Sequence, residues 1–281
     1  MDKRNADRMR VPLFLLLTTL GTPWIPCRVE AAGGAGGSGV SVSSGEMPEL
    51  YREWSLVLER FVVPLDGGGT GIRYRQLAVD RGDFDAFLKK LATTDPATLS
   101  SRDDQLAFWI NVYNAFAIQA ILDHDIPASI KDLDTWIPPE PIWKKKWFMV
   151  GGKAISLERI EHEILRPTFK EPRIHAAIVC ASRSCPDLQP WPYLPQLLDA
   201  QLDTAMRSFL ANPKGASLDR ERGILQLSAI FEWFRKDFEA SGSLLQYLDG
   251  YLPEGIRSYL ASNPAPKVKH AEYDWTLNEA P

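Results

Sequence analysis

The segment from Asp104 to Leu122 constrains the fold most, because its apolar side chains are not confined to one side of a helix. On a wheel of about 100° per residue they point in nearly every direction, which is typical of a helix buried on most sides. We therefore predict a long central helix in the protein core. Its apolar members are Leu106, Phe108, Trp109, Ile110, Val112, Tyr113, Phe116, Ile118, Ile121 and Leu122.

Two asparagines lie within this apolar segment. Asn111 and Asn114 are three residues apart, so a helix places them on the same face. An unpaired buried amide would cost about 1–3 kcal/mol, so both amides need hydrogen-bond partners. These partners are either neighbouring backbone groups in the core or members of a polar site.

Net charge and the length of the longest apolar N-terminal run argue against two classes of protein, nucleic-acid-binding proteins and integral membrane proteins. The chain has 32 Lys and Arg against 36 Asp and Glu, a formal net charge of -4, which does not favour binding to nucleic-acid phosphates. Its most apolar N-terminal run, Val11 to Leu20, is about half of the roughly 20 residues that a bilayer span requires. We predict no nucleic-acid partner and no integral membrane segment after removal of a signal peptide.

The N-terminal region has the pattern of a secretory signal. Basic residues precede the short apolar run and small residues follow it at Ala31 and Ala32, so we predict a signal peptide over 1–32 that contains Cys27. Residues 33–46 are rich in Gly and Ser and predict a flexible linker. One folded domain over 47–281, exported to the periplasm or secreted, is the expected organisation.

The region around residue 160 combines polar and apolar signals. Gly-Gly at 151–152 predicts a hairpin. On the helix that follows, Glu161 lies within the apolar face, and His162 lies about 100° further round the helical wheel, at the edge of that face. Pro167 is expected to end this helix. The run Ile174–Cys180 predicts a buried strand in which His175 and Cys180 face opposite sides. Further helices are predicted before Pro64 and over 84–91, 196–210 and 229–238, with a strand over 223–227.

Five blocks of sequence resemble the signature of the DUF547 family, whose function is unassigned. They are AFWINVYNAFAIQAIL (107–122), SIKDL (129–133), SLERIEHEILR (156–166), RIHAAIVCASRSCPDL (173–188) and YDWTLN (273–278). The resemblance implies an α+β fold similar to papain-like and transglutaminase-like cysteine hydrolases, with a long buried central helix packed on a small antiparallel sheet and surrounded by helices. Those enzymes place a nucleophilic cysteine at the start of the central helix. Here Asp103, Asp104 and Gln105 occupy that position.

If the chain is an enzyme, we expect acyl transfer or amide hydrolysis with Cys180 as nucleophile and His162 as base. Glu161, Asn111 and Asn114 would supply polar support. No cofactor or metal is expected, and the substrate is an unidentified peptide or cell-envelope component. The remaining binding residues are expected to be His175, Arg183, Cys185, Tyr273, Asp274, Trp275 and Asn278.

Three other interpretations of the cysteines stay open. In an oxidising compartment, Cys180 and Cys185 would form a disulfide bond. Metal binding by His175 and both cysteines is a second interpretation, although three ligands at this spacing match no standard zinc signature. In the third interpretation, Cys180 is a buried structural residue beside an anion or peptide pocket that contains Arg183. The last interpretation and the disulfide both favour a binding module for peptide or cell-envelope material.

Overall fold

The computed structural model describes residues 28–29, 40–41 and 47–281. The predicted signal peptide and linker therefore lie largely outside the described residues. Within them, strand β1 (Arg28–Val29) pairs antiparallel with β2 (Val40–Ser41). The rest of the description concerns the mixed helical and β-structured region from residue 47 onward, which agrees with the predicted α+β class.

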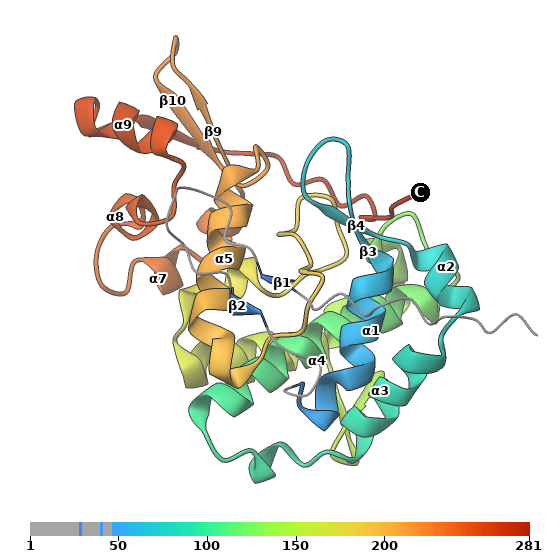
Figure 1. The fold of residues 1–281 in the computed structure, drawn as a ribbon. Helices are drawn as coiled ribbons and strands as arrows, with labels where there is room; N and C mark the ends of the chain where they lie inside the picture. The colour runs from blue at the N-terminus through green and yellow to red at the C-terminus, as the bar shows by residue number, and fades with distance from the viewer. Residues whose placement is uncertain (1–27, 30–39, 42–46) are drawn as a thin grey trace, which may run out of the picture.

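Helix α4 (Arg102–Leu122) is the predicted central helix, and its side chains from Leu106 to Ile118 are all buried. Its first turn is a capping box, in which the Ser101 hydroxyl accepts the Asp104 backbone N–H and the Asp104 carboxylate accepts the Ser101 N–H. By length and composition α4 is apolar enough to cross a membrane, but 89% of its most apolar window is buried inside the protein. Figure 1 shows α4 running through the lower middle of the molecule.

The elements before α4, together with one hairpin that follows it in the chain, form one side of the core (Figure 1). Amphipathic helices α1 and α3 pack against each other through a stacked pair of rings, Trp54 and Phe87. A hairpin after α1 and a second hairpin that packs on α3 complete this side. The elements are η1 (Glu49–Tyr51), α1 (Arg52–Phe61), β3 (Val62–Pro64), β4 (Thr70–Ile72), α2 (Tyr74–Val79), α3 (Gly82–Thr93), η2 (Pro96–Thr98), β7 (Phe148–Val150) and β8 (Lys153–Ile155).

The sheets differ from the expected small antiparallel sheet beneath the central helix. The three-stranded sheet has the order β11-β10-β9, with β9 antiparallel and β11 parallel to β10, and lies at one edge of the molecule (Figure 1). Helix α4 instead packs mainly against helical segments η5, η7 and α2. The remaining strands are β5 (Thr135–Trp136), β6 (Pro139–Glu140), β9 (Ala216–Asp219), β10 (Ile224–Leu227) and β11 (Lys267–His270).

The helix that carries Glu161 is wider and longer than predicted. Residues Arg159–Phe169 form the π-helix η5, in which Pro167 is an internal residue and not the end. The segment ends at Lys170, which has a left-handed φ of 49° and donates its N–H to the Arg166 carbonyl. In a π-helix each carbonyl accepts the N–H five residues later, and not four as in an α-helix. The Pro167 ring therefore approaches a different carbonyl from the one it would meet in an α-helix. Such wide turns occur frequently at functional sites.

The predicted strand over 174–180 is wrong. Pro172–Ala176 form the 3₁₀-helix η6, and residues 178–180 are irregular. Pro172 fits the first turn of η6, and the Glu171 carboxylate caps that turn by accepting the Arg173 N–H at 3.2 Å. A short apolar run does not distinguish a strand from another buried segment, so periodicity alone misled this prediction.

Besides the three-stranded sheet and helix α5 (Leu198–Ala211), the C-terminal half consists of short helices and a final irregular segment. The predicted helix over 229–238 is divided at Phe234 into α6 and α7. After β11 the chain runs back along the molecule, and bridges join Thr276 to Ser129 and Leu277 to Ser182. The remaining helices are η3 (Ile130–Leu133), η4 (Ile142–Lys144), η7 (Pro195–Leu197), α5 (Leu198–Ala211), α6 (Ile230–Trp233), α7 (Arg235–Phe238), α8 (Leu244–Asp249) and α9 (Glu254–Ser262).

Candidate functional site

A cavity of about 210 Å³ lies between the central helix, η5, the 178–186 segment, α6 and the C-terminal segment. Aromatic rings form much of its wall, and Glu161, His162, His175 and both cysteines of the described chain also line it. We call this cavity the aromatic pocket. Its aromatic members are Tyr113, Trp143, Trp233, Phe234, Tyr273 and Trp275.

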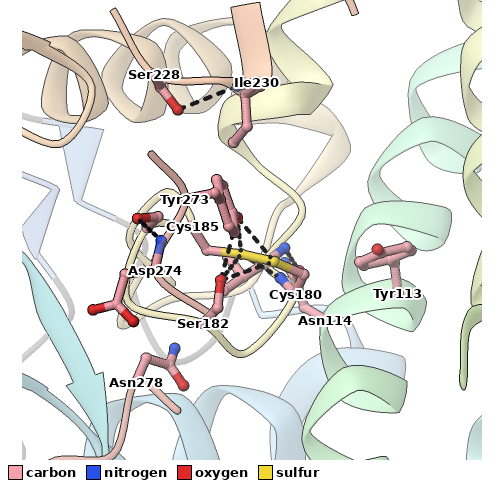
Figure 2. The surroundings of a disulfide bond; sticks show 12 residues. Tyr113, Asn114, Cys180, Ser182, Cys185, Ser228, Ile230, Tyr273, Asp274 and Asn278 are labelled. Atoms are coloured by element: carbon pink, nitrogen blue, oxygen red, sulfur yellow. Dashed lines mark hydrogen bonds between the residues drawn. A yellow bond between two sulfur atoms is a disulfide. The ribbon is translucent and has the colours of Figure 1, made fainter. Parts of the chain in front are cut away.

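Cys180 and Cys185 are joined by a disulfide bond, one of the states that the sequence left open. Cys185 is 2% exposed, whereas Cys180 is partly exposed toward the pocket. The Tyr273 hydroxyl lies 3.1 Å from each sulfur, and the Ser182 hydroxyl lies 3.3 Å from each (Figure 2). In this oxidised state Cys180 has no thiol to act as nucleophile, and neither sulfur is a thiolate ligand for a metal.

His175 is buried beside the disulfide loop. Its Nε2 lies 2.8 Å from an Asp237 carboxylate oxygen, and its ring stacks on Phe234 with 4.0 Å between centroids. Burial lowers the pKa of His175 despite the opposing Asp237 charge. Because the predicted strand is absent, His175 and Cys180 do not face opposite sides but line the same pocket.

Asp237 also binds a guanidinium group. Arg166 donates from Nε and Nη2 to the two carboxylate oxygens at 2.6 and 3.1 Å. Burial alone would raise the pKa of Asp237, but the hydrogen bonds from His175 and Arg166 hold it well below its usual range. Asp237 is therefore a carboxylate at neutral pH, and it fixes both its partners in place.

Glu161 projects from η5 to the wall of the pocket with 12% of its side chain exposed. One oxygen accepts the Tyr113 hydroxyl at 3.3 Å, and the other lies 3.9 Å from His175 Nδ1. Burial raises the pKa of Glu161 to about 7, although Arg166 and Tyr113 act in the opposite direction. A carboxyl group with this pKa exchanges protons near neutral pH, which is common in functional sites.

His162 lines the pocket from an exposed position on η5. Its Nδ1 is within 2.9 Å of Arg166 Nη1, so the partner that the structure gives it is a cation. Partial burial of the ring and the Arg166 charge both lower the pKa of His162. The expected role as base toward Cys180 stays a prediction.

The two asparagines of α4 hold backbone groups and do not line the pocket. Asn111 accepts from Trp54 Nε1 and the Tyr193 N–H, and donates to the Tyr193 carbonyl at 2.8 Å. Asn114 donates to the Ala177 carbonyl at 2.9 Å and accepts the Val179 N–H at 2.8 Å. The prediction of satisfied amides is confirmed, and Asn114 positions the chain that leads into Cys180.

The other predicted binding residues divide between two places. Tyr273 and Trp275 belong to the aromatic pocket, whereas Arg183 and Asn278 line a second, wider hollow of about 1070 Å³. The Asn278 amide oxygen accepts the Tyr74 hydroxyl at 2.9 Å. Asp274 lines neither hollow, and its carboxylate accepts the Thr276 backbone N–H at 2.9 Å. Among the described residues, no group of three or more His, Cys, Asp or Glu side chains is placed to hold a metal ion.

Sequence reasoning missed several residues of the site. The apolar pattern of the central helix predicts only a core position for Tyr113, and the predicted site does not include Trp143. Trp233, Phe234 and Asp237 lie in the segment predicted as one continuous helix, so their pattern gave no signal of a site. The exposure of Trp233, 49%, is visible only in the folded structure.

Comparison with known proteins identifies part of the chain. Residues 96–210 match a family model described as "Protein of unknown function, DUF547". No curated protein matches the chain, and no solved structure matches it. The matched region contains α4, Glu161, His175 and the disulfide, whereas α6, α7 and the C-terminal wall of the pocket lie beyond it.

Proposed function

We propose that this chain, whose residues 96–210 match the DUF547 family model, is an exported binding protein that holds part of a peptide or cell-envelope component in the aromatic pocket. The carrying observation is the disulfide: both cysteines line the pocket, and their sulfurs are bonded to each other. The disulfide bond therefore lies in the pocket wall at the position where a thiol hydrolase would have a free, nucleophilic cysteine.

The composition of the pocket supports binding. Ligand sites typically combine apolar and aromatic walls with a few polar groups that fix the orientation of the ligand. Here aromatic rings form much of the wall, and the ionisable groups that line it are Glu158, Glu161, His162 and His175. Each aromatic ring provides a large contact area, and ordering it on binding costs little side-chain entropy.

The proposed export rests on two features. The sequence over 1–32 has the order of a secretory signal, with basic residues before a short apolar run. A disulfide also persists in oxidising compartments and is rare in the cytosol.

A second candidate is a thiol-dependent hydrolase or acyl transferase with a papain-like or transglutaminase-like fold, active after reduction of the disulfide. It is favoured by one observation: Cys180 and His175 line the same pocket, and Asp237 binds the His175 ring. A carboxylate that orients an imidazole is the arrangement of catalytic triads. In this candidate His175 replaces His162 as the expected base.

Alkylation of the natively exported protein, followed by mass spectrometry from pH 5 to 9, tests the proposal. We expect a Cys180–Cys185 disulfide in essentially every molecule, with no alkylation before a reductant is added. A free Cys180 that alkylates rapidly well below pH about 8.5, and slowly in His175→Ala, would overturn the proposal in favour of the hydrolase. His124→Ala, at the end of α4, is the matched control for loss of an imidazole.

A further inference from the structure

The outer part of the aromatic pocket is a cluster of indole and phenol rings from three separate segments. Tyr273 lies 4.8 Å from Trp233 and 4.5 Å from Trp275, and the Trp143 and Trp275 centroids are 6.2 Å apart. Trp233 and Trp275 lie 6.0 Å apart with an angle of 15° between their planes. Trp233 is 49% exposed, so part of this cluster is open to a ligand.

The charged groups that line the pocket are acidic. Glu158 and Glu161 are its carboxyl groups, and among the lining residues of the described chain none is Lys or Arg. His162 and His175 both have a lowered pKa, so these imidazoles are mainly neutral at pH 7. The positive charge of the nearby Arg166 is balanced by the Asp237 carboxylate, to which Arg166 donates two hydrogen bonds.

One ring of the cluster already contacts an ammonium group. Lys131 Nζ lies 5.0 Å from the centroid of the Trp275 ring. Lys131 is not among the residues that line the pocket, so this contact is made from outside the cavity. A cation within about 6 Å of an indole face is attracted by the negative potential of the ring.

The size of the cavity restricts the ligand. Its volume of about 210 Å³ is below the roughly 300–1,000 Å³ typical of sites that enclose a drug-sized molecule. The pocket therefore suits a compact headgroup, with the rest of the ligand outside.

We infer that the aromatic pocket recognises an organic cation, a quaternary or alkylated ammonium headgroup, whose charge lies against the Trp233, Tyr273 and Trp275 rings and near the Glu161 carboxyl. This inference rests on the proposed binding function and names its ligand class. Rings supply the cation–π attraction, and the carboxyl groups supply the countercharge.

Choline and its neutral carbon isostere, 3,3-dimethylbutan-1-ol, test the inference because they have nearly the same shape and differ in charge. Binding to the oxidised full chain is measured by isothermal titration calorimetry at pH 8 and by the NMR shifts of the methyl protons. We expect choline to bind about tenfold more tightly than the alcohol, with upfield methyl shifts from the ring faces.

Variants locate the binding. Trp233→Ala is expected to weaken choline binding about fivefold, whereas Trp136→Ala, which removes an 86% exposed ring outside the pocket, leaves it unchanged. Glu161→Gln and Glu158→Gln are expected to weaken binding of choline but not of the alcohol. Two carboxyl variants keep the test valid if one of them folds poorly.

Equal affinity for choline and the alcohol, or no binding of choline, would overturn the inference. Equal affinity would leave the proposed binding function intact, because the pocket would still bind an uncharged group. The proposed function fails on a separate result, the free and reactive Cys180 in the alkylation experiment, so the two failures are distinguishable.

Discussion

Two sets of buried polar side chains in this molecule differ in what their hydrogen-bonding atoms face. Asn111 and Asn114, on α4, are 1% and 2% exposed and bond to backbone groups of the 177–193 region. Glu161 and His175 are also largely buried, but they line a cavity and carry a shifted pKa. The asparagines fix the backbone of neighbouring segments. Glu161 and His175, in contrast, face a cavity where they can interact with a ligand or exchange a proton.

The largest effect is expected from Asn111→Ala. The substitution leaves the Trp54 indole N–H and the Tyr193 backbone groups without their partner in the core, so we expect the free energy of unfolding to fall by about 4 kcal/mol. Urea unfolding, monitored by circular dichroism, measures this fall in the free energy of unfolding. Asn263→Ala, at an exposed position, is the matched control and should change stability by about 0.5 kcal/mol or less. A loss below about 1 kcal/mol at Asn111 would remove the contrast between the two sets.

Glu161 should show the opposite behaviour, because its ionisation destabilises the fold. Its pKa is about 7 in the folded chain and 4.5 ordinarily, so the cost is absent below pH 4.5 and grows until pH 7 is passed. At about 1.36 kcal/mol per pKa unit the full cost is about 3 kcal/mol. The titratable groups that surround Glu161 are Tyr113, Arg166, His175, Asp237 and Tyr273.

The measurement is the difference in unfolding free energy between Glu161→Gln and the parent chain from pH 4 to pH 8. We expect no difference near pH 4 and a variant that is more stable by up to about 3 kcal/mol at pH 8. Glu163→Gln, on the exposed side of η5, controls for loss of a charge. A difference that does not change with pH would show that Glu161 ionises as freely as an exposed carboxyl.

The smallest effect is expected from the disulfide. Closing a loop with a sequence separation of five limits the unfolded chain only modestly, so replacing both cysteines by alanine should cost about 2 kcal/mol. Reductant should lower the stability of the parent chain by a similar amount and leave the double variant unchanged. If reductant affects neither protein, the disulfide contributes to the pocket wall without stabilising the fold.

Parts of the fold were predictable from local pattern. The all-round apolar segment gave α4, Gly151–Gly152 gave the β7–β8 hairpin, and the apolar spacing gave α1, α3 and α5. The strand over 174–180 was not predictable correctly, since its conformation depends on Pro172, the Glu171 cap and the bonds from Asn114. Of the pocket residues, the sequence pointed to the two cysteines, the two histidines and three others, but it placed His175 on the side opposite Cys180. These seven are Glu161, His162, His175, Cys180, Cys185, Tyr273 and Trp275.

The sequence by itself determined which groups had to be buried and which buried groups needed partners, because burial and hydrogen-bond satisfaction follow from local periodicity and residue type. Only the tertiary structure decided which of those groups share a cavity. Tyr273 meets Cys180 across 93 positions of the chain, and Asp237 meets His175 across 62. Contacts at such separations depend on how the helices pack, and no local pattern in the sequence encodes them.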